Sequence, residues 1–295
     1  MTDARTFTLD LGGKWLARYG SCACPCCQPD RRRDQNALTV ADGTDGRLLL
    51  HCKKAGCSFA DITRAAGVTP GSYTPPDPAV IAQRKAEERQ QAERKSQQAR
   101  RCWDEALPIG NTIAERYLRN RGIRCDLPGS LRYHPEAWHG PTAKRYPAMI
   151  AMVEGADGCA IHRTYLAPDG RGKAGLDGGD KLMLGAVAGG AVRLTEAQNT
   201  IVVCEGIETG LALASGLLRR PATIYAALST SGIRGLILPP SPGRITVATD
   251  GDDAGRAAGQ ELAERAHATG WQVSLLPAPQ GKDWNDVLLG KEVAA

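Results

Sequence analysis

The stretch TIVVCEGIETG, residues 200–210, decides the fold, and ITVATDGDDAG, residues 245–255, repeats its pattern. In each stretch a short β-branched run predicts a strand, carboxylates follow it, a glycine permits a sharp turn, and a helix-like segment begins. Parallel strands that alternate with helices share one sheet edge at their carboxyl ends, so we expect Glu205 close to Asp250 and Asp252. The sequence therefore predicts a small parallel sheet of the α/β class with acids at one edge.

Carboxylates that converge at such an edge repel one another unless a divalent cation lies between them, and oxygen ligands suit Mg²⁺ or Mn²⁺. A third acidic cluster, GKDWND (residues 281–286), follows another predicted strand, QVSLLP (residues 272–277). Acidic residues at helix starts are also common caps, and Asp253 and Asp286 fit that simpler explanation equally well. Three clusters after successive strands favour a metal site for phosphoryl transfer, where metals orient a phosphate and neutralise developing charge.

The N-terminal part carries a second chemical signal, the cysteines of SCACPCCQPD (residues 21–30) and LHCKKAGCSF (residues 50–59). Two ligand pairs about 25 residues apart on tight turns are typical of a zinc ribbon, which closes one tetrahedral structural site. The C-x₂-C spacing favours Cys24 and Cys27 as the first pair, and the second pair is Cys52 and Cys57, with a wider gap. The alternatives left open are Cys22, Cys26 and, in place of Cys52, His51. The other cysteines are scattered and are expected to pack in the interior: Cys102, Cys125, Cys159 and Cys204.

Composition places few limits on function. The chain has 295 residues and a formal net charge of +5, which permits nucleic-acid binding without requiring it. The N-terminus MTDARTFTLD lacks the apolar core of a signal peptide, and no run approaches the roughly 20 apolar residues of a membrane span. We therefore expect a cytoplasmic protein with no membrane partner, in which metal binding explains ten cysteines better than disulfides do.

The pattern along the chain predicts four parts. Residues 1–70 form the zinc ribbon. Residues 71–106 form a linker, in which a proline-rich connector that starts at the boundary (TPGSYTPPDP, residues 69–78) leads into a long polar surface helix. Residues 107–196 mix strands with glycine-rich loops. Residues 197–295 contain the parallel sheet. The expected fold is thus α/β: an N-terminal zinc ribbon, a linker helix, a mixed α/β region and a C-terminal parallel-sheet domain.

The motifs EGIETG, DGDDAG and KDWND, in this order, resemble those of the Toprim domain, which DnaG-type primases, topoisomerases, some nucleases and recombination proteins share. The order of zinc module, linker, mixed region and Toprim resembles the primases of phages, plasmids and integrative elements. GNTIAERYLRNRGI (residues 110–123) and HRTYLAPDG (residues 162–170) resemble stretches that precede Toprim in that group. The resemblance covers nearly the whole chain apart from the charged helix and implies a Rossmann-like C-terminal sheet.

The resemblance also implies the site residues. The metal-site acids would be Glu205, Asp250, Asp252 and Asp283, with the first three catalytic and Glu205 the candidate general base. KDWND has Asn285 where chromosomal primases tend to carry another aspartate, and it resembles the KD-x-N form of phage and mitochondrial primase-helicases, which predicts a weaker third metal contact.

The implied function is a DNA primase that makes short RNA primers on single-stranded DNA from NTPs by metal-dependent nucleotidyl transfer. The alternatives are a Toprim nuclease that cuts DNA with the same metals and a non-catalytic single-strand-binding replication accessory. No G-x₄-GK[ST] motif occurs in the sequence, so a helicase would act in trans.

Basic residues before the parallel sheet are the candidates for nucleic-acid or nucleotide binding. Arg163 and Lys181 lie in otherwise apolar or glycine-rich segments, which favours a functional role over a solvated one. Arg116 and Arg119 are better explained as a solvated helix face. Two histidines are expected in a loop without a functional role: His134 and His139.

Overall fold

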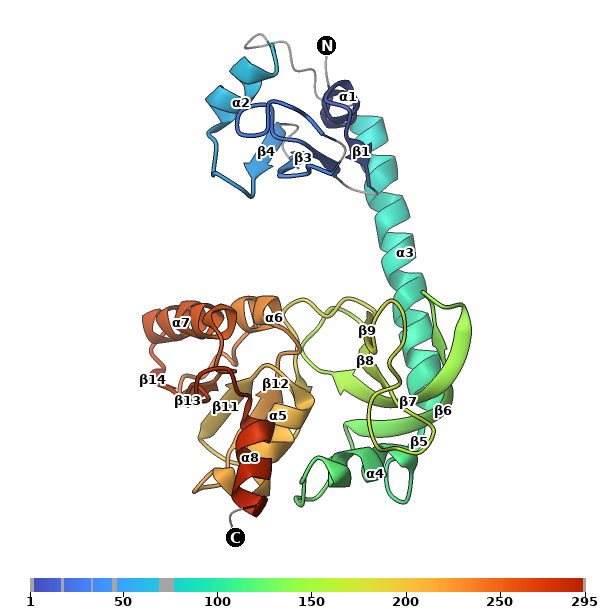
Figure 1. Cartoon of the computed structure of the whole chain (residues 1–295), viewed down its shortest axis with the longest axis vertical. Coiled ribbons are helices and arrows are strands. Elements are labelled where there is room, and N and C mark those ends of the chain that lie inside the picture. Colours follow the sequence, from blue (N-terminus) through green and yellow to red (C-terminus); the bar gives the residue numbers. More distant parts are fainter. Residues whose placement is uncertain (1–2, 17–18, 33, 44–46, 69–76, 294–295) are drawn as a thin grey trace. The chain divides into compact units, whose positions relative to one another are not determined.

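The computed structural model describes residues 3–16, 19–32, 34–43, 47–68 and 77–293 (Figure 1). The chain divides into two compact units, Met1–Glu88 and Arg89–Ala295. Most of the predicted proline-rich connector, residues 69–76, lies outside the described residues. Among the described residues, no helix is both long and apolar enough to cross a membrane.

The first unit is a small antiparallel sheet with two short helices. Two of its strands, Leu38–Asp42 and Leu48–Cys52, pair with each other in antiparallel register. The apolar side chains of Phe7, Leu38 and Ile62 form its centre. Its elements are α1 (Ala4–Asp10), β1 (Lys14–Trp15), β2 (Gly20–Cys22), β3 (Leu38–Asp42), β4 (Leu48–Cys52) and α2 (Phe59–Ala65), with the strands in the order β1-β2-β3-β4.

The predicted polar helix is α3 (Pro78–Glu105), and its last turns are not a surface spacer as expected. Ala99 and Trp103 are buried against the sheet of the second unit, because they place apolar surface at this end of the helix. The Arg132 guanidinium lies 4.3 Å from the centroid of the Trp103 ring and donates to its backbone carbonyl at 3.0 Å. The end of α3 is therefore part of the second unit's core.

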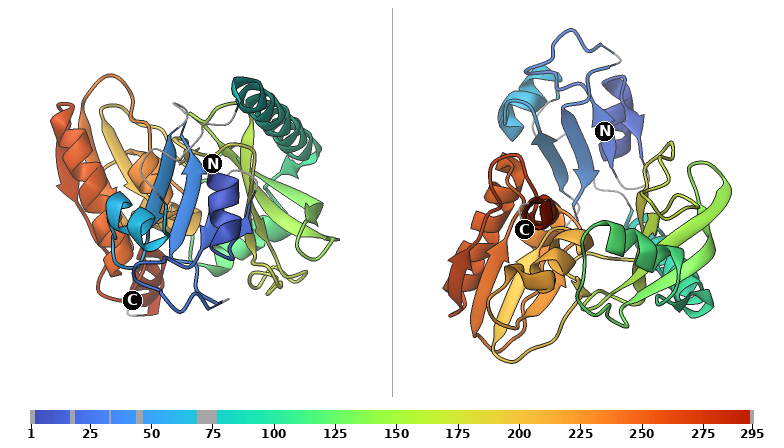
Figure 2. Two further views of the ribbon diagram at one scale, coloured as in Figure 1. Left: turned by 90° about the horizontal axis from the view of Figure 1, so that it is seen from above. Right: turned by 60° about the horizontal axis from the view of Figure 1, so that its bottom comes forward.

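The second unit begins with a five-stranded antiparallel sheet between α3 on one face and α4 (Ile113–Asn120) on the other (Figure 2). Thr112 caps α4 by accepting from the Glu115 backbone N–H. The strands, in spatial order, are β5 (Leu107–Pro108), β6 (Leu131–His139), β7 (Lys144–Val153), β8 (Ala160–Tyr165) and β9 (Lys181–Leu184).

Strand β6 corrects the prediction that His134 and His139 lie in a loop. His134 lies beside a β-bulge, and its ring is 3.5 Å from a carboxylate oxygen of Glu105. His139 is fully buried, with its ring nitrogens within hydrogen-bond distance of the Thr142 hydroxyl and the Gly179 carbonyl. Both histidines therefore have structural partners.

The C-terminal sheet is the predicted parallel one, with helices on both faces (Figure 1). Its strand order is β10 (Val192–Arg193), β12 (Thr223–Ala226), β11 (Thr200–Cys204), β13 (Arg244–Ala248) and β14 (Gln272–Leu275), with only β10 antiparallel to its neighbour. One face carries α5 (Ile207–Ala212), a π-helical turn (Leu213–Leu217) and α8 (Trp284–Val293), and the other carries α6 (Thr230–Gly235) and α7 (Asp253–Ala268). The α/β class and the parallel sheet are as predicted.

The two sheets of the second unit share one hydrophobic core. Strand β11 shows how this arises: Val203 packs toward α6 and α7, whereas Val202 and Cys204 pack with residues of the antiparallel sheet such as Leu131 and Met149. Side chains on a strand alternate between the two faces, so one strand contributes to two cores. The antiparallel region and the parallel sheet therefore form a continuous body.

Candidate active site and metal centre

The acids predicted from the sequence lie at the carboxyl edge of the parallel sheet. Cys204 at the end of β11 pairs in register with Ala248 at the end of β13, so Glu205 and Asp250 leave the sheet at neighbouring points. We call Glu205, Asp250, Asp252 and Asp283 the acidic edge. Because parallel strands end together, residues about 45 positions apart in sequence reach one site.

Gly251 explains how the loop after β13 brings Asp283 into this group. A Cβ at Gly251 would collide with the Pro279 carbonyl, so only glycine permits this approach. The Gly251 N–H donates to the Lys282 carbonyl at 2.8 Å, and the Gly281 N–H donates back to the Gly251 carbonyl at 2.9 Å. Two backbone hydrogen bonds thus hold the segment before Asp283 against the loop that carries Asp250 and Asp252.

The carboxylates of the acidic edge repel one another. Burial raises the pKa of Asp250 to about 6, and the charges of Glu205, Asp283 and Asp252 add to this effect. Burial, and then the charge of Asp252, also raises the pKa of Glu205. Carboxylates held close together at a partly buried position favour either protonation of a carboxyl group or binding of a divalent cation. Oxygen-only ligands of this kind fit Mg²⁺ or Mn²⁺.

Two of these acids also fix the local backbone. Asp252 caps α7, where its Oδ1 accepts from the Gly255 N–H at 2.6 Å. Asp283 accepts from the Asp286 N–H at 2.7 Å at the start of α8. Each carboxylate keeps a further oxygen for another partner, so capping and metal binding are compatible.

Glu208 belongs to the same edge but was not predicted as a site residue. It is 5% exposed, accepts a hydrogen bond from the Tyr117 hydroxyl at 2.8 Å and pairs with the Lys181 ammonium at 3.1 Å. Burial opposes its ionisation, but Lys181, its own backbone N–H and Tyr117 outweigh burial and lower its pKa to about 2. The signal was present in EGIETG, where Glu208 stands one helical turn after Glu205.

The two predicted basic residues lie on opposite faces of the antiparallel sheet. Lys181 points toward the acidic edge through its contact with Glu208. Arg163 packs with Ile161 and Tyr165 on the face that α3 covers. His162, the neighbour of Arg163 on β8, faces the side of Lys181, and burial followed by the Lys181 charge lowers its pKa to about 4. The structure therefore brings Lys181, but not Arg163, to the acidic edge.

Asn285 is not turned toward the acidic edge in the manner of a weaker metal contact. Its side chain is fully buried, and its Nδ2 donates to the backbone carbonyl of Arg121 at 2.7 Å. This hydrogen bond connects the start of α8 to the C-terminal end of α4. Asn285 thus links the two halves of the second unit.

The four favoured cysteines come together in the first unit. One ligand atom from each of Cys24, Cys27, Cys52 and Cys57 lies within 4.8 Å of the others, and among the described residues they are the one group of potential ligands gathered so closely. Zn–S bonds of about 2.3 Å place the sulfurs of a tetrahedron about 3.8 Å apart, and the Cys27 and Cys52 sulfurs are 3.5 Å apart. The donor set and spacing fit one structural zinc ion.

Hydrogen bonds fix the loops that carry these cysteines and favour the thiolate form at Cys52. The buried Gln28 side chain accepts from the N–H groups of Cys24 and Ala37, both at 3.1 Å, and so fixes the first knuckle. At Cys52, burial opposes ionisation, but backbone N–H groups including that of Ala55 lower the thiol pKa to about 6. The thiolate is the ligand form of cysteine. Of the alternatives, Cys22 packs in the core and Cys26 is exposed.

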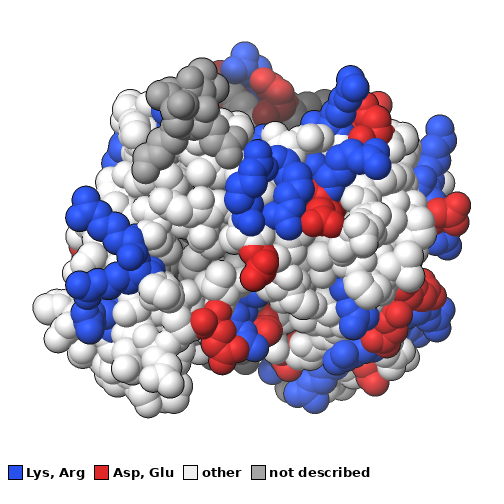
Figure 3. Space-filling view, turned by 90° about the horizontal axis from the view of Figure 1, so that it is seen from below, with Lys and Arg blue, Asp and Glu red and all other residues white. Residues whose placement is uncertain are grey.

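Charged side chains on the face shown in Figure 3 form several separate groups, with acidic groups between the basic ones. A strand of nucleic acid would therefore meet cations at intervals on this face and not along one continuous band.

Two known domain families match stretches of the second unit. Residues 200–292 match the Toprim domain family, and residues 93–194 match a domain of unknown function, DUF7146. The C-terminal part of the chain is therefore a Toprim domain, which confirms the resemblance drawn from EGIETG, DGDDAG and KDWND.

Three solved primase structures are similar to the chain at low identity. The Aquifex aeolicus primase (zinc-binding and RNA polymerase domains) is 13% identical, with 100% of this chain and 84% of that chain covered and a TM-score of 0.41. The RNA polymerase domain of Mycobacterium tuberculosis primase DnaG is 15% identical, with coverages of 67% and 78% and a TM-score of 0.40. The primase fragment of the bacteriophage T7 primase-helicase protein is 13% identical, with coverages of 93% and 96% and a TM-score of 0.32. No similar protein was found among curated sequences.

Proposed function

We propose that this protein is a DnaG-like DNA primase that joins NTPs into short RNA primers on single-stranded DNA. The observation that carries the proposal is the acidic edge of the Toprim domain, where Glu205, Asp250 and Asp252 are all present and lie beside a lysine from the preceding sheet. Phosphoryl transfer requires positioning and neutralisation of charge more than it requires covalent chemistry. Clustered carboxylates and a nearby ammonium group are suited to that task.

In this proposal Glu205, Asp250, Asp252 and Asp283 hold Mg²⁺ or Mn²⁺. Divalent metal bound there supplies the charge neutralisation that the phosphates need during transfer. Glu205 accepts the proton of the attacking primer 3′-hydroxyl. Lys181, held in place by Glu208, binds the triphosphate, and pyrophosphate leaves as the new phosphodiester bond forms.

The first unit, with its structural zinc, is proposed to contact the template, and the region before Toprim to form the other wall of the catalytic site. A helicase that acts in trans is the proposed protein partner. A template and nucleotides of this kind place the activity in the cytoplasm. The alternative is a Toprim nuclease. It would use the same metals but would cut DNA instead of making RNA primers.

One assay separates these functions. The full chain is incubated with single-stranded DNA, labelled NTPs and either Mg²⁺ or Mn²⁺, and the products are resolved by length. We expect new short oligomers from the labelled nucleotides. Shortened template would instead indicate a nuclease, and a bound but unchanged template would indicate a binding accessory. Glu205→Gln should remove the oligomers, whereas Asp253→Asn, whose carboxylate is 99% exposed, should retain them.

A further inference from the structure

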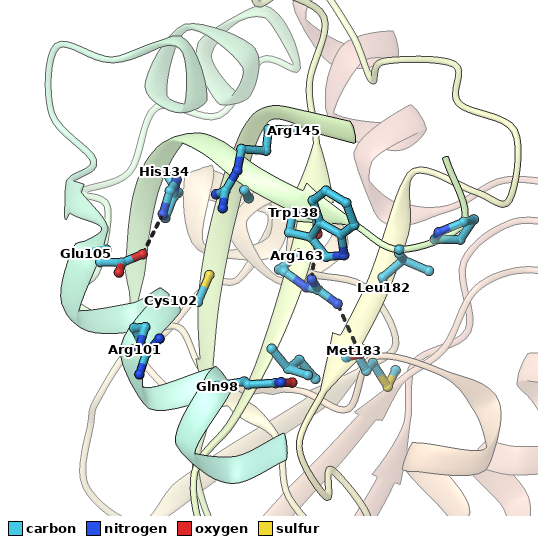
Figure 4. Close-up of a pocket in the computed structure, with 14 residues that line it drawn as sticks. Gln98, Arg101, Cys102, Glu105, His134, Trp138, Arg145, Arg163, Leu182 and Met183 are labelled. Atoms are coloured by element: carbon cyan, nitrogen blue, oxygen red, sulfur yellow. Dashed lines mark hydrogen bonds and ion pairs between the residues drawn. The ribbon is translucent and has the colours of Figure 1, made fainter. Parts of the chain in front are cut away.

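A cavity of about 500 Å³ lies on the face of the antiparallel sheet that α3 covers, away from the acidic edge (Figure 4). We call it the arginine pocket. Apolar side chains from β9 complete its wall, and the residues that define it come from α3, β6, β7 and β8: Arg101, Glu105, His134, Trp138, Arg145 and Arg163.

Arg163 is the unusual member of this pocket. Arg163 is only 8% exposed. Its guanidinium donates to the backbone carbonyls of Trp138 at 2.8 Å and Met183 at 3.4 Å. Its Nε has no hydrogen-bond partner, and no carboxylate of the described residues pairs with it. A buried charge without a counter-ion is costly, since neutral carbonyls replace only part of the lost hydration. An anion that enters the pocket would compensate this charge.

Two further cations stand around the opening. Arg145 lies on β7 directly opposite Trp138 in the strand register, so the two side chains share a face of the sheet. Arg101 reaches the pocket from α3, and both arginines are exposed. The acidic residue that lines the pocket is Glu105, which is 3.5 Å from the ring of His134. The lining therefore has an excess of positive charge.

Trp138 supplies a flat apolar surface next to these cations. Its backbone carbonyl accepts from both Arg163 and the Tyr165 hydroxyl, so its position on β6 is fixed from within the core. The residue is nevertheless 49% exposed. Figure 4 shows its indole beside Arg163 in the pocket. Exposed indole rings stack well on nucleobases, and guanidinium groups bind phosphates with several donors.

We propose that the arginine pocket binds a nucleotide, with the base against Trp138 and the phosphate between Arg101, Arg145 and Arg163. The pocket lies within the roughly 300–1,000 Å³ of small-molecule sites. It is separate from the acidic edge, because Arg163 is consecutive on β8 with His162, which faces the side of Lys181, and neighbouring residues on a strand point to opposite faces. The nucleotide could be free or part of a nucleic-acid strand, and these two sources share the same recognition chemistry.

The test measures binding to the full chain without added divalent metal, in an Asp250→Asn and Asp252→Asn background. The probes are ATP with a fluorescent ribose substituent and an oligo(dT) of about ten nucleotides, a length within the range of single-strand sites. Arg101→Gln and Arg145→Gln should each weaken binding about tenfold, since each removes charged hydrogen bonds. Trp138→Leu should weaken it about fivefold or more. Lys144→Gln, an exposed neighbour outside the pocket, is the matched control and should bind normally.

Arg163→Met tests the buried charge itself. It retains apolar volume, so binding should be lost while the thermal midpoint stays unchanged or rises; if this variant does not fold, the three exposed positions still decide the question. If the variants lose ATP binding, and oligo(dT) does not compete with ATP for the unsubstituted pocket, the ligand is a free nucleotide. If the same variants lose oligo(dT) binding, the ligand is a strand. The proposal is overturned if neither probe binds, or if Arg101→Gln and Arg145→Gln bind as tightly as Lys144→Gln.

Discussion

Replacing Asp250 by asparagine should stabilise the metal-free protein while it abolishes primer synthesis. The physical reason is burial of this carboxyl, together with repulsion from the other acids of the acidic edge, which raises its pKa from 3.8 to about 6. A carboxyl whose folded pKa is raised costs stability above that pKa and costs none below its unfolded pKa. The penalty in wild-type protein is therefore complete near pH 7.5 and mostly lost by pH 4.

The size of the effect follows from the pKa shift. Each pKa unit corresponds to about 1.4 kcal/mol, so the shift sets an upper value of about 3 kcal/mol. Asp250 is partly exposed, and solvent screening reduces this value to about 1–2 kcal/mol. For a unit of this size each kcal/mol moves the thermal midpoint by roughly 2–4 °C. Asp250→Asn should thus raise the midpoint by several degrees near pH 7.5.

The measurement is thermal unfolding of wild type, Asp250→Asn and Asp253→Asn in metal-free buffer at pH 7.5 and pH 4. The exposed Asp253 is a matched control at the same loop and should change neither stability nor priming. Added Mg²⁺ should raise the midpoint of wild type but not that of Asp250→Asn. A destabilised Asp250→Asn protein at pH 7.5, or an equal gain at both pH values, would refute the reasoning, since the ionised carboxyl would then not be the destabilising group.

Four other changes test the remaining groups. Glu205→Gln should lower the priming rate by at least about 10²–10⁴-fold, the contribution of a general base, and near-normal priming would exclude that role. Cys24→Ser and Cys27→Ser should each lose the zinc, which metal analysis of wild type should find at about one per chain, while Cys102→Ser retains it. Asp252→Ala should cost about 1 kcal/mol in unfolding free energy through loss of the α7 cap, whereas Asp252→Asn, also a good cap, should not. His162 is buried with its pKa lowered to about 4, so the unfolded chain binds its proton first and stability should fall by about 2 kcal/mol between pH 6.5 and pH 5; His162→Gln should remove this pH dependence and the exposed His267→Gln should not.

Local patterns in the sequence were sufficient to predict the parallel sheet, the acidic residues at its carboxyl edge and the cluster of four cysteines. The β-branched runs before Glu205 and Asp250 form strands, and the cysteine pairs converge because each pair lies on a tight turn. These features depend on neighbours in sequence, or on the general rule that parallel strands end at one edge.

The features that were missed depend on contacts between distant segments. Strand β6 contains Pro135, which weakens a strand signal, and the structure accommodates it at a bulge between His134 and Ala137. Every residue of β8 is buried, so no alternation of apolar and polar residues indicated that Arg163 faces away from the acidic edge. Glu208 resembled an ordinary acidic residue in a first helical turn, so its spacing from Glu205 was an insufficient signal without its contacts with Tyr117 and Lys181.

The core that both sheets share has a consequence for how the chain is made. The antiparallel region leaves the ribosome first, and the side chains of Leu131 and Met149 then pack with α4 but lack the part of their core that β11 and its helix supply later. The link from Asn285 to Arg121 forms last, after another 164 positions have been translated. The nascent protein therefore exposes an apolar surface during much of its synthesis and should engage chaperones there. The two stretches that match separate domain families must fold together.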